Sequence, residues 1–154
     1  RILADYRELG PLVQREQSAG RRVALANGCF DVLHVGHVRL LAEARQHCDV
    51  LVVALNSDAS TRASKGPERP LVPLAERMEL VAALAGVDYV TSFGEPTADA
   101  MIRALRPDLL VKGTDRTPEG VPERDTLAAC GGRVLICGDS KAHSSSELIR
   151  RLGG

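Results

Sequence analysis

The sequence predicts an α/β fold, a single doubly wound domain with a five-stranded parallel sheet and helices on both faces. Short apolar runs alternate along the chain with segments of helical periodicity, which is the order of elements in a parallel sheet. Most of these runs are continuous Val, Leu, Ile and Ala, as expected for strands that are covered on both faces. The 154 residues, 44% of them hydrophobic, suffice for one domain with a substantial core.

The first 20 residues are expected to form a helical appendage to a domain that spans residues 21–154. They are polar with scattered apolar positions. Pro11 and Gly20 can stand at the start and just past the end of a short helix over residues 11–19.

Five strands are expected in the remainder, and helices connect them. The strands are the apolar runs 23–26, 50–55, 89–92, 109–112 and 134–137. The helices are 38–47, 74–85, 97–105 and 145–152, with a shorter one that includes 126–129. Right-handed crossovers between such elements give a Rossmann-like sheet, in which ligands bind beyond the carboxyl ends of the strands.

One long stretch, residues 57–73, has no predicted element. It carries positive charge at Arg62, Lys65 and Arg69, and Gly66 lies among them. Long loops in compact domains are usually functional or disordered. From the residues alone two interpretations stay open, a flap that closes over phosphates and a solvated loop.

Composition argues against several classes of partner. Twenty basic and twenty acidic residues cancel, whereas nucleic-acid-binding proteins normally have a basic excess, so no nucleic-acid partner is expected. The four cysteines show no CxxC spacing, and buried free thiols suit a reducing, cytoplasmic location. No apolar run reaches the ~20 residues of a membrane span and no signal peptide is visible, so no membrane association is expected.

Residues 27–37 join the first apolar run to the helix that follows it. His34 and His37 stand three residues apart where that helix begins, so both project from one face and can reach the same anion. Unpaired N–H groups and the helix dipole make a helix start a phosphate site, and Gly36 leaves room for close approach. We therefore expect a nucleotide-phosphate site, and we disfavour zinc because it needs three or four ligands.

The same residues carry a resemblance. His34-Val35-Gly36-His37 is similar to the HxGH signature of the cytidylyltransferase-like nucleotidyltransferases. The whole run resembles, more narrowly, the ADP-heptose-forming branch. The likeness continues through residues 53–60, 65–66, 69–70, 76–78 and 107–113, and covers the chain from about residue 20 to residue 152.

The resemblance implies an adenylyltransferase that transfers AMP from ATP, with Mg²⁺, to D-glycero-beta-D-manno-heptose 1-phosphate. The products would be ADP-heptose and pyrophosphate. It also implies a homodimer and a sugar kinase as a partner or fused domain. The alternatives are a cytidylyltransferase acting on glycerol 3-phosphate or a similar alditol phosphate, an FAD-synthase-like adenylyltransferase, and a nucleotide-binding regulatory domain without turnover.

In-line adenylyl transfer needs groups that position phosphates and neutralise charge rather than a covalent intermediate. His34 and His37 are therefore expected to donate hydrogen bonds to the phosphates. By resemblance, Lys65 matches the loop lysine that contacts the triphosphate in this family. These three are the predicted catalytic residues.

The resemblance assigns further residues to ligands. The nucleotide-binding set is Cys29, Phe30, Arg77, Lys112, Asp115, Ser144, Ser145 and Ser146. Asp31 and Asn56 are assigned to the acceptor sugar. Structural alternatives stay open for several of these residues: core packing for the Phe30 ring, a surface ion pair for Lys112 and Asp115, a solvated helix charge for Arg77, and a helix cap or a place beside the metal for Asp31.

Residues 143–146 stand where the family has an ISTT-like motif and match it only in part. His143 replaces the usual Ile, and serines replace both threonines. Ser144 with Glu147 also forms a capping box. The arginine that precedes this motif in glycerol 3-phosphate cytidylyltransferases is missing here, which weighs towards adenine.

Overall fold

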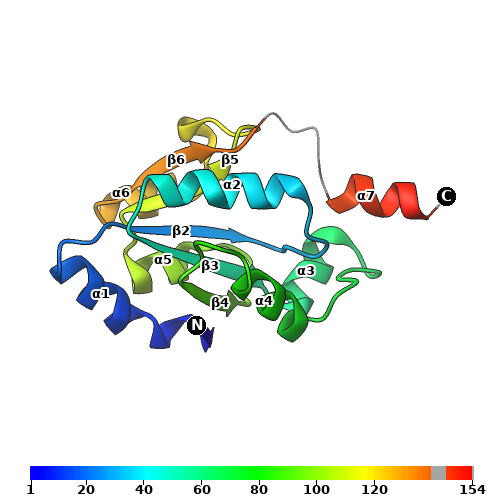
Figure 1. The fold of residues 1–154 in the computed structure, drawn as a ribbon, viewed down its shortest axis with the longest axis horizontal. Coiled ribbons are helices and arrows are strands. Elements are labelled where there is room, and N and C mark those ends of the chain that lie inside the picture. The colour runs from blue at the N-terminus through cyan, green and yellow to red at the C-terminus, as the bar shows by residue number, and fades with distance from the viewer. Residues whose placement is uncertain (140–144, 154) are drawn as a thin grey trace.

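The computed structural model describes residues 1–139 and 145–153, with side chains through 139 and from 147 onward. The fold is α/β, with a six-stranded parallel sheet in the order β1-β4-β3-β2-β5-β6 (Figure 1). The strands are β1 (Ile2–Asp5), β2 (Val23–Gly28), β3 (Val50–Asn56), β4 (Tyr89–Phe93), β5 (Leu109–Gly113) and β6 (Arg133–Cys137).

Helices connect the strands in a regular succession. They are α1 (Gly10–Ser18), α2 (Val35–Gln46), α3 (Asp58–Lys65), α4 (Leu74–Ala82), α5 (Asp99–Leu105), α6 (Arg124–Ala129) and α7 (Ser145–Leu152). Single 3₁₀ turns lie at Tyr6–Glu8 and Pro118–Gly120. Among these described helices none is long and apolar enough to cross a membrane.

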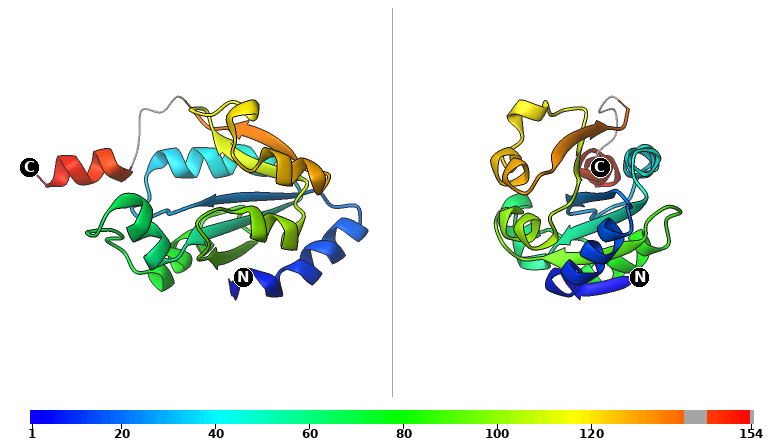
Figure 2. Two further views of the ribbon diagram at one scale, coloured as in Figure 1. Left: turned by 180° about the vertical axis from the view of Figure 1, so that it is seen from behind. Right: turned by 90° about the vertical axis from the view of Figure 1, so that its left-hand side faces the viewer.

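Two hydrophobic layers bury the two faces of the sheet, because successive strand residues point to opposite sides. On one face Leu25 and Val52 pack with residues of α1, α5 and α6. On the other face Ala26 and Val53 pack with residues of α2 and α4. Figure 2 shows α2 and α5 on opposite sides of the sheet. The prediction of a parallel sheet covered on both faces is therefore confirmed.

The predicted number of five strands is wrong, because β1 adds a sixth at the edge beside β4. This strand is short and mostly exposed, so it lacks the continuous apolar run by which the other strands were predicted. The expected helix over residues 11–19 is present as α1. Between the two, Tyr6 and Leu9 are buried in the core, so the segment 1–20 contributes to the sheet and its packing.

The prediction that residues 57–73 lack regular structure is also wrong in its first half, which forms α3. Ser57 caps this helix, since its hydroxyl accepts a hydrogen bond from the N–H of Ser60 at 3.1 Å. Gly66 ends it with φ at 114°, a conformation that favours glycine. The polar sequence hid the helix because it offers almost no apolar stripe, and only residues 66–73 remain a loop.

Aspartates accept hydrogen bonds from backbone N–H groups at the amino ends of the strands, opposite the edge of the sheet formed by the carboxyl ends. Asp49 accepts a hydrogen bond from the N–H of Arg22, Asp88 from that of Leu51 and Asp108 from that of Val23, all at 2.8 Å. These carboxylates pair backbone N–H groups that would otherwise lack partners at the start of each strand.

Candidate active site

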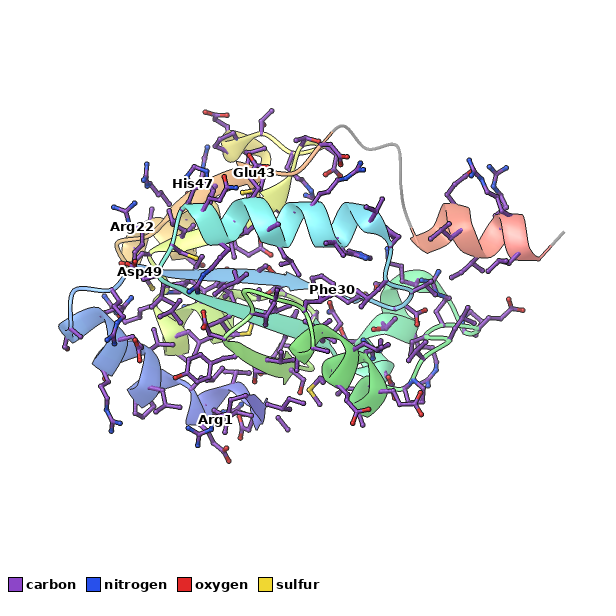
Figure 3. All side chains as sticks on the ribbon, viewed as in Figure 1. Arg1, Arg22, Phe30, Glu43, His47 and Asp49 are labelled. Atoms are coloured by element: carbon purple, nitrogen blue, oxygen red, sulfur yellow. The ribbon has the colours of Figure 1, made fainter. Side chains whose placement is uncertain are left out.

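The candidate site lies at the carboxyl ends of β2, β3 and β5. Ala26 is in register with Val53 on one side and Val111 on the other, so the residues that follow these three strands meet at one edge. The chain leaves β2 towards β3 and β4, whereas β5 and β6 lie on the other side, which makes the β2–β5 boundary a topological switch point. Figure 3 shows Phe30 at this end of β2, and Arg22 and Asp49 at the other.

His34 and His37 form the start of α2 and face each other. Their rings are stacked, with centroids 3.9 Å apart and an interplanar angle of 27°. His34 is the N-cap: its Nδ1 accepts from the N–H of Gly36 at 3.0 Å, and Nδ1 of His37 accepts from the N–H of His34 at 3.3 Å. The two imidazoles thus build a reciprocal capping box of the kind usually made by Ser and Glu.

This capping arrangement fixes which nitrogen carries the proton. An Nδ1 that accepts a backbone hydrogen bond has no hydrogen of its own, so the neutral ring carries its proton on Nε2. Both half-buried histidines therefore hold an Nε2–H donor at the positive end of a helix. The predicted pairing of the two rings on one face is present.

The turn after β2 is tightly built. Phe30 has φ at 49°, and its ring is buried 5.0 Å from the ring of His37. A Cβ added to Gly28 would lie 3.2 Å from the Phe30 ring, so glycine lets the ring fold back over the end of β2. The interpretation of the ring as core is confirmed, whereas the predicted main-chain contact to phosphate stays a prediction.

Asp31 is buried, and its carboxylate is occupied by the chain itself. It accepts hydrogen bonds from Nε of Arg69 at 2.6 Å and from the N–H groups of Leu71 and Val72, each at 2.9 Å. Burial by itself raises the pKa of Asp31, but these donors outweigh it and bring the pKa below its usual value. The helix-cap interpretation is wrong because His34 is the cap. The structure shows Asp31 anchoring the loop 66–73, and its predicted contact with the acceptor sugar stays a prediction.

Arg77 is fully buried, so the interpretation as a solvated charge is wrong. Its guanidinium donates to the carbonyls of Val72, Cys29 and Asn56 at 2.8, 2.7 and 2.9 Å and to Asp58 at 2.6 Å. Four of its five N–H groups are thereby used by protein acceptors. These contacts hold the loops around the site, and the predicted role of Arg77 in nucleotide binding stays a prediction.

Asn56 and Lys65 flank α3. The Asn56 amide donates to the hydroxyl of Ser60 at 2.9 Å, and its oxygen lies 3.7 Å from Sγ of Cys29. The structure therefore brings Asn56 next to the turn after β2. Lys65 is the exposed last residue of α3, directly before the loop 66–73.

Lys112 lies at the end of β5, beside the end of β2. Its Nζ is 3.4 Å from Oδ1 of Asn27 and 3.7 Å from Oε2 of Glu123. Burial lowers the pKa of Lys112, while the nearby Glu123 carboxylate acts in the opposite direction. Exposed Asp115 reaches back towards the strand end, since a Cβ on Gly113 would lie 3.0 Å from its Oδ1.

Glu123 was not predicted from the sequence. It is buried just before α6, and among the described residues its Oε2 has no hydrogen-bond partner. No local sequence motif marks Glu123, because Lys112, with which it forms an ion pair at 3.7 Å, is separated from it in sequence and is brought close by the sheet. Other predicted residues lie outside the part of the chain that is described: residues 143 and 144, and the side chains of Ser145 and Ser146 at the start of α7.

No group of three or more His, Cys, Asp and Glu side chains that could hold a metal ion occurs within residues 1–139 and 145–153. The acidic residues of the site are used in other ways. Asp31 binds Arg69 and Asp58 binds Arg77, while Glu123 faces Lys112.

The sequence matches the family model described as cytidylyltransferase-like over residues 25–151, which is most of the chain. The chain belongs to this family. Cytidylyltransferase-like relatives include the "Bifunctional protein HldE" of Gluconacetobacter diazotrophicus, 48% identical over 140 residues, which cover 91% of this chain and 29% of the relative. The "Bifunctional protein HldE" of Geobacter metallireducens is 44% identical over 144 residues, which cover 94% of this chain and 29% of the relative.

This cytidylyltransferase-like chain therefore spans about three-tenths of the length of these relatives. Among solved structures it resembles the lipopolysaccharide core biosynthesis protein from Thermoplasma volcanium GSS1, with a TM-score of 0.69 and 23% identity. That match covers 79% of this chain and 100% of the other, and at this identity it shows a shared fold.

Proposed function

We propose that the chain is a nucleotidyltransferase that transfers AMP from ATP to a heptose 1-phosphate, giving ADP-heptose and pyrophosphate. The observation that carries the proposal is the stacked pair His34 and His37, which offers two Nε2–H donors at the start of α2 beside the switch point of the sheet. The similarity to proteins named HldE, at 44% to 48% identity, supports the same branch of the family.

The reaction is a displacement at the α-phosphorus. A phosphate oxygen of the sugar 1-phosphate forms the new P–O bond, the bond from the α-phosphorus to the bridging oxygen of the β-phosphate breaks, and pyrophosphate leaves. The two histidines donate to non-bridging oxygens, where charge builds in the transition state, and Lys65 and Lys112 add positive charge around the phosphates. No group of the protein needs to form a covalent bond.

The proposed cofactor is Mg²⁺, which enters bound to the triphosphate of ATP. Mg²⁺ keeps several waters and is commonly held by one or two carboxylates plus substrate phosphates. Because no three-ligand cluster occurs in the described residues, phosphate oxygens and water fit this chain better than a dedicated protein cage. Bound in this way, the ion would supply positive charge next to the phosphates, in addition to that of Lys65 and Lys112.

The test is a pyrophosphate-release assay with purified protein, ATP, MgCl₂ and D-glycero-beta-D-manno-heptose 1-phosphate. We expect turnover that requires all three, and the absence of turnover with heptose and hexose 1-phosphates would overturn the proposal. Thermal shifts with ATP and CTP decide the nucleotide. Stronger protection by ATP is expected, whereas stronger protection by CTP would indicate a cytidylyltransferase.

Further aspects of the proposal concern the cellular setting. We propose a cytoplasmic enzyme that acts as a homodimer. The relatives are named bifunctional, and this chain spans 29% of their length, which supports a second enzyme, a sugar kinase, as a fused domain or partner. Light scattering of the purified chain tests the dimer.

A further inference from the structure

Arg77 is a buried cation that lies beside the candidate site. Its side chain is fully buried, and it starts from the first turn of α4, outside the strand ends that form the site. Burying a guanidinium is costly unless its N–H groups all meet acceptors. The acceptors it meets are therefore the clue to its role.

Two of these acceptors belong to the strand ends at the ligand edge. One terminal nitrogen of Arg77 donates to the carbonyl of Cys29, just after β2, and to that of Asn56, the last residue of β3. Carbonyl oxygens left unpaired here would put negative partial charge next to a bound triphosphate. Arg77 pairs both and adds a positive charge beneath the turn that leads to His34.

The other acceptors belong to the loop and helix on the far side. Nε donates to the carbonyl of Val72, and the second terminal nitrogen donates to the carboxylate of Asp58 in α3. The N–H of Val72 in turn donates to Asp31, which also holds Arg69. The loop 66–73 is thus tied to the turn after β2 through both backbone polar groups of Val72.

We propose that Arg77 is a positioning residue for adenylyl transfer: it holds the turn after β2, the end of β3 and the loop 66–73 in the mutual arrangement that the reaction requires. This rests on the proposed function. Lysine cannot replace it, because four acceptors in different directions match the planar five-donor fork of arginine and not the single ammonium of lysine. In this proposal the residue acts through its neighbours, because its side chain is fully buried and donates to protein acceptors.

The test compares Arg77→Lys and Arg77→Gln with Val13→Ala. Val13 is a buried residue of α1 in the hydrophobic core on the other face of the sheet, so its variant is the control. For each protein the thermal midpoint, the kcat, the KM for ATP and the Kd for ATP by calorimetry are measured. We expect the Arg77 variants to lose at least ~10-fold in kcat, as expected when reacting groups are misplaced by a small displacement. The control loses thermal stability but keeps its kcat.

Arg77 variants that stay folded with the kcat of the wild type would overturn the proposal. So would a loss of kcat no larger than that of a control of equal stability. If neither Arg77 variant folds, Asp58→Asn decides: it leaves the guanidinium in place and removes its charged partner. A several-fold lower kcat is expected, and an unchanged kcat refutes the positioning role.

The wild-type measurement separates this proposal from the proposed function. Absence of turnover by the wild type means that the activity is wrong. Wild-type turnover with unaffected Arg77 variants means that the positioning role is wrong.

Discussion

Replacing His37 by Asn and by Gln separates its two roles, because the two amides mimic different nitrogens of the imidazole. The Asn side-chain oxygen can take the place of Nδ1, which accepts from the N–H of His34 at 3.3 Å. The Gln amide nitrogen can take the place of Nε2, the proposed donor to phosphate. His37→Asn should therefore keep the cap and lose the donor. His37→Gln should keep the donor, and because Gln is a usual N3 residue of a capping box, its oxygen can still accept from the N–H of His34.

The magnitudes follow from the geometry. The cap hydrogen bond is long, so even its complete loss should cost only about 0.5–1 kcal/mol in the free energy of unfolding, the lower part of the range for N-caps, and both variants retain an acceptor for it. Losing one donor to a transition-state oxyanion costs about 2.7–4 kcal/mol, or about 10²–10³ in kcat. His37→Asn should thus be nearly as stable as the wild type and slower by about that factor.

Urea unfolding gives the first quantity, and pyrophosphate release at saturating substrates gives the second. His37→Gln should retain more activity than His37→Asn, and the two should be similarly stable. A fully active His37→Asn variant, or the opposite order of activities, would refute the assignment of Nδ1 to the cap and Nε2 to the phosphates.

Two further predictions concern titratable groups away from the histidines. Asp31→Asn should lower the free energy of unfolding at neutral pH by about 3 kcal/mol, the scale for breaking a buried charged pair. The pKa of Asp31 is lowered in the folded protein, so the carboxylate stabilises the fold above its unfolded pKa of about 3.9. This stabilisation is lost as the pH falls through the folded pKa. Urea unfolding should therefore show that the free energies of unfolding of Asp31→Asn and the wild type become more similar in acid. Burial, aided by the Glu43 carboxylate, raises the pKa of the Cys137 thiol to about 11. Mass spectrometry after alkylation at pH 8 should therefore find Cys137 unmodified in the folded protein and modified in denaturant, and rapid modification of the folded protein would contradict its burial.

Local patterns in the sequence were enough for the central strands and for the histidine pair. Continuous apolar runs marked the central strands β2, β3 and β5, because strands buried on both faces have no polar alternation. The i, i+3 spacing of His34 and His37 at a helix start is likewise local, and the structure stacks their rings. The short edge strand β1 and the polar helix α3 gave no such signal.

Contacts between distant residues explain the structural interpretations of Arg77 and Asp31 that were wrong. Arg77 meets Cys29 across 48 positions of sequence, and Asp31 meets Arg69 across 38. In sequence each looks like an isolated charge in or near a loop or helix start, which is usually solvated. Only the folded chain shows that both are buried and hold other parts of the site.

The most direct test of the histidine assignment is a crystal structure of the protein with bound ATP or ADP-heptose. We expect Nε2 of both His34 and His37 within about 2.7–3.2 Å of phosphate oxygens, with both Nδ1 atoms still accepting backbone hydrogen bonds. Phosphates bound at another edge of the sheet, or rings rotated so that Nδ1 faces them, would contradict it.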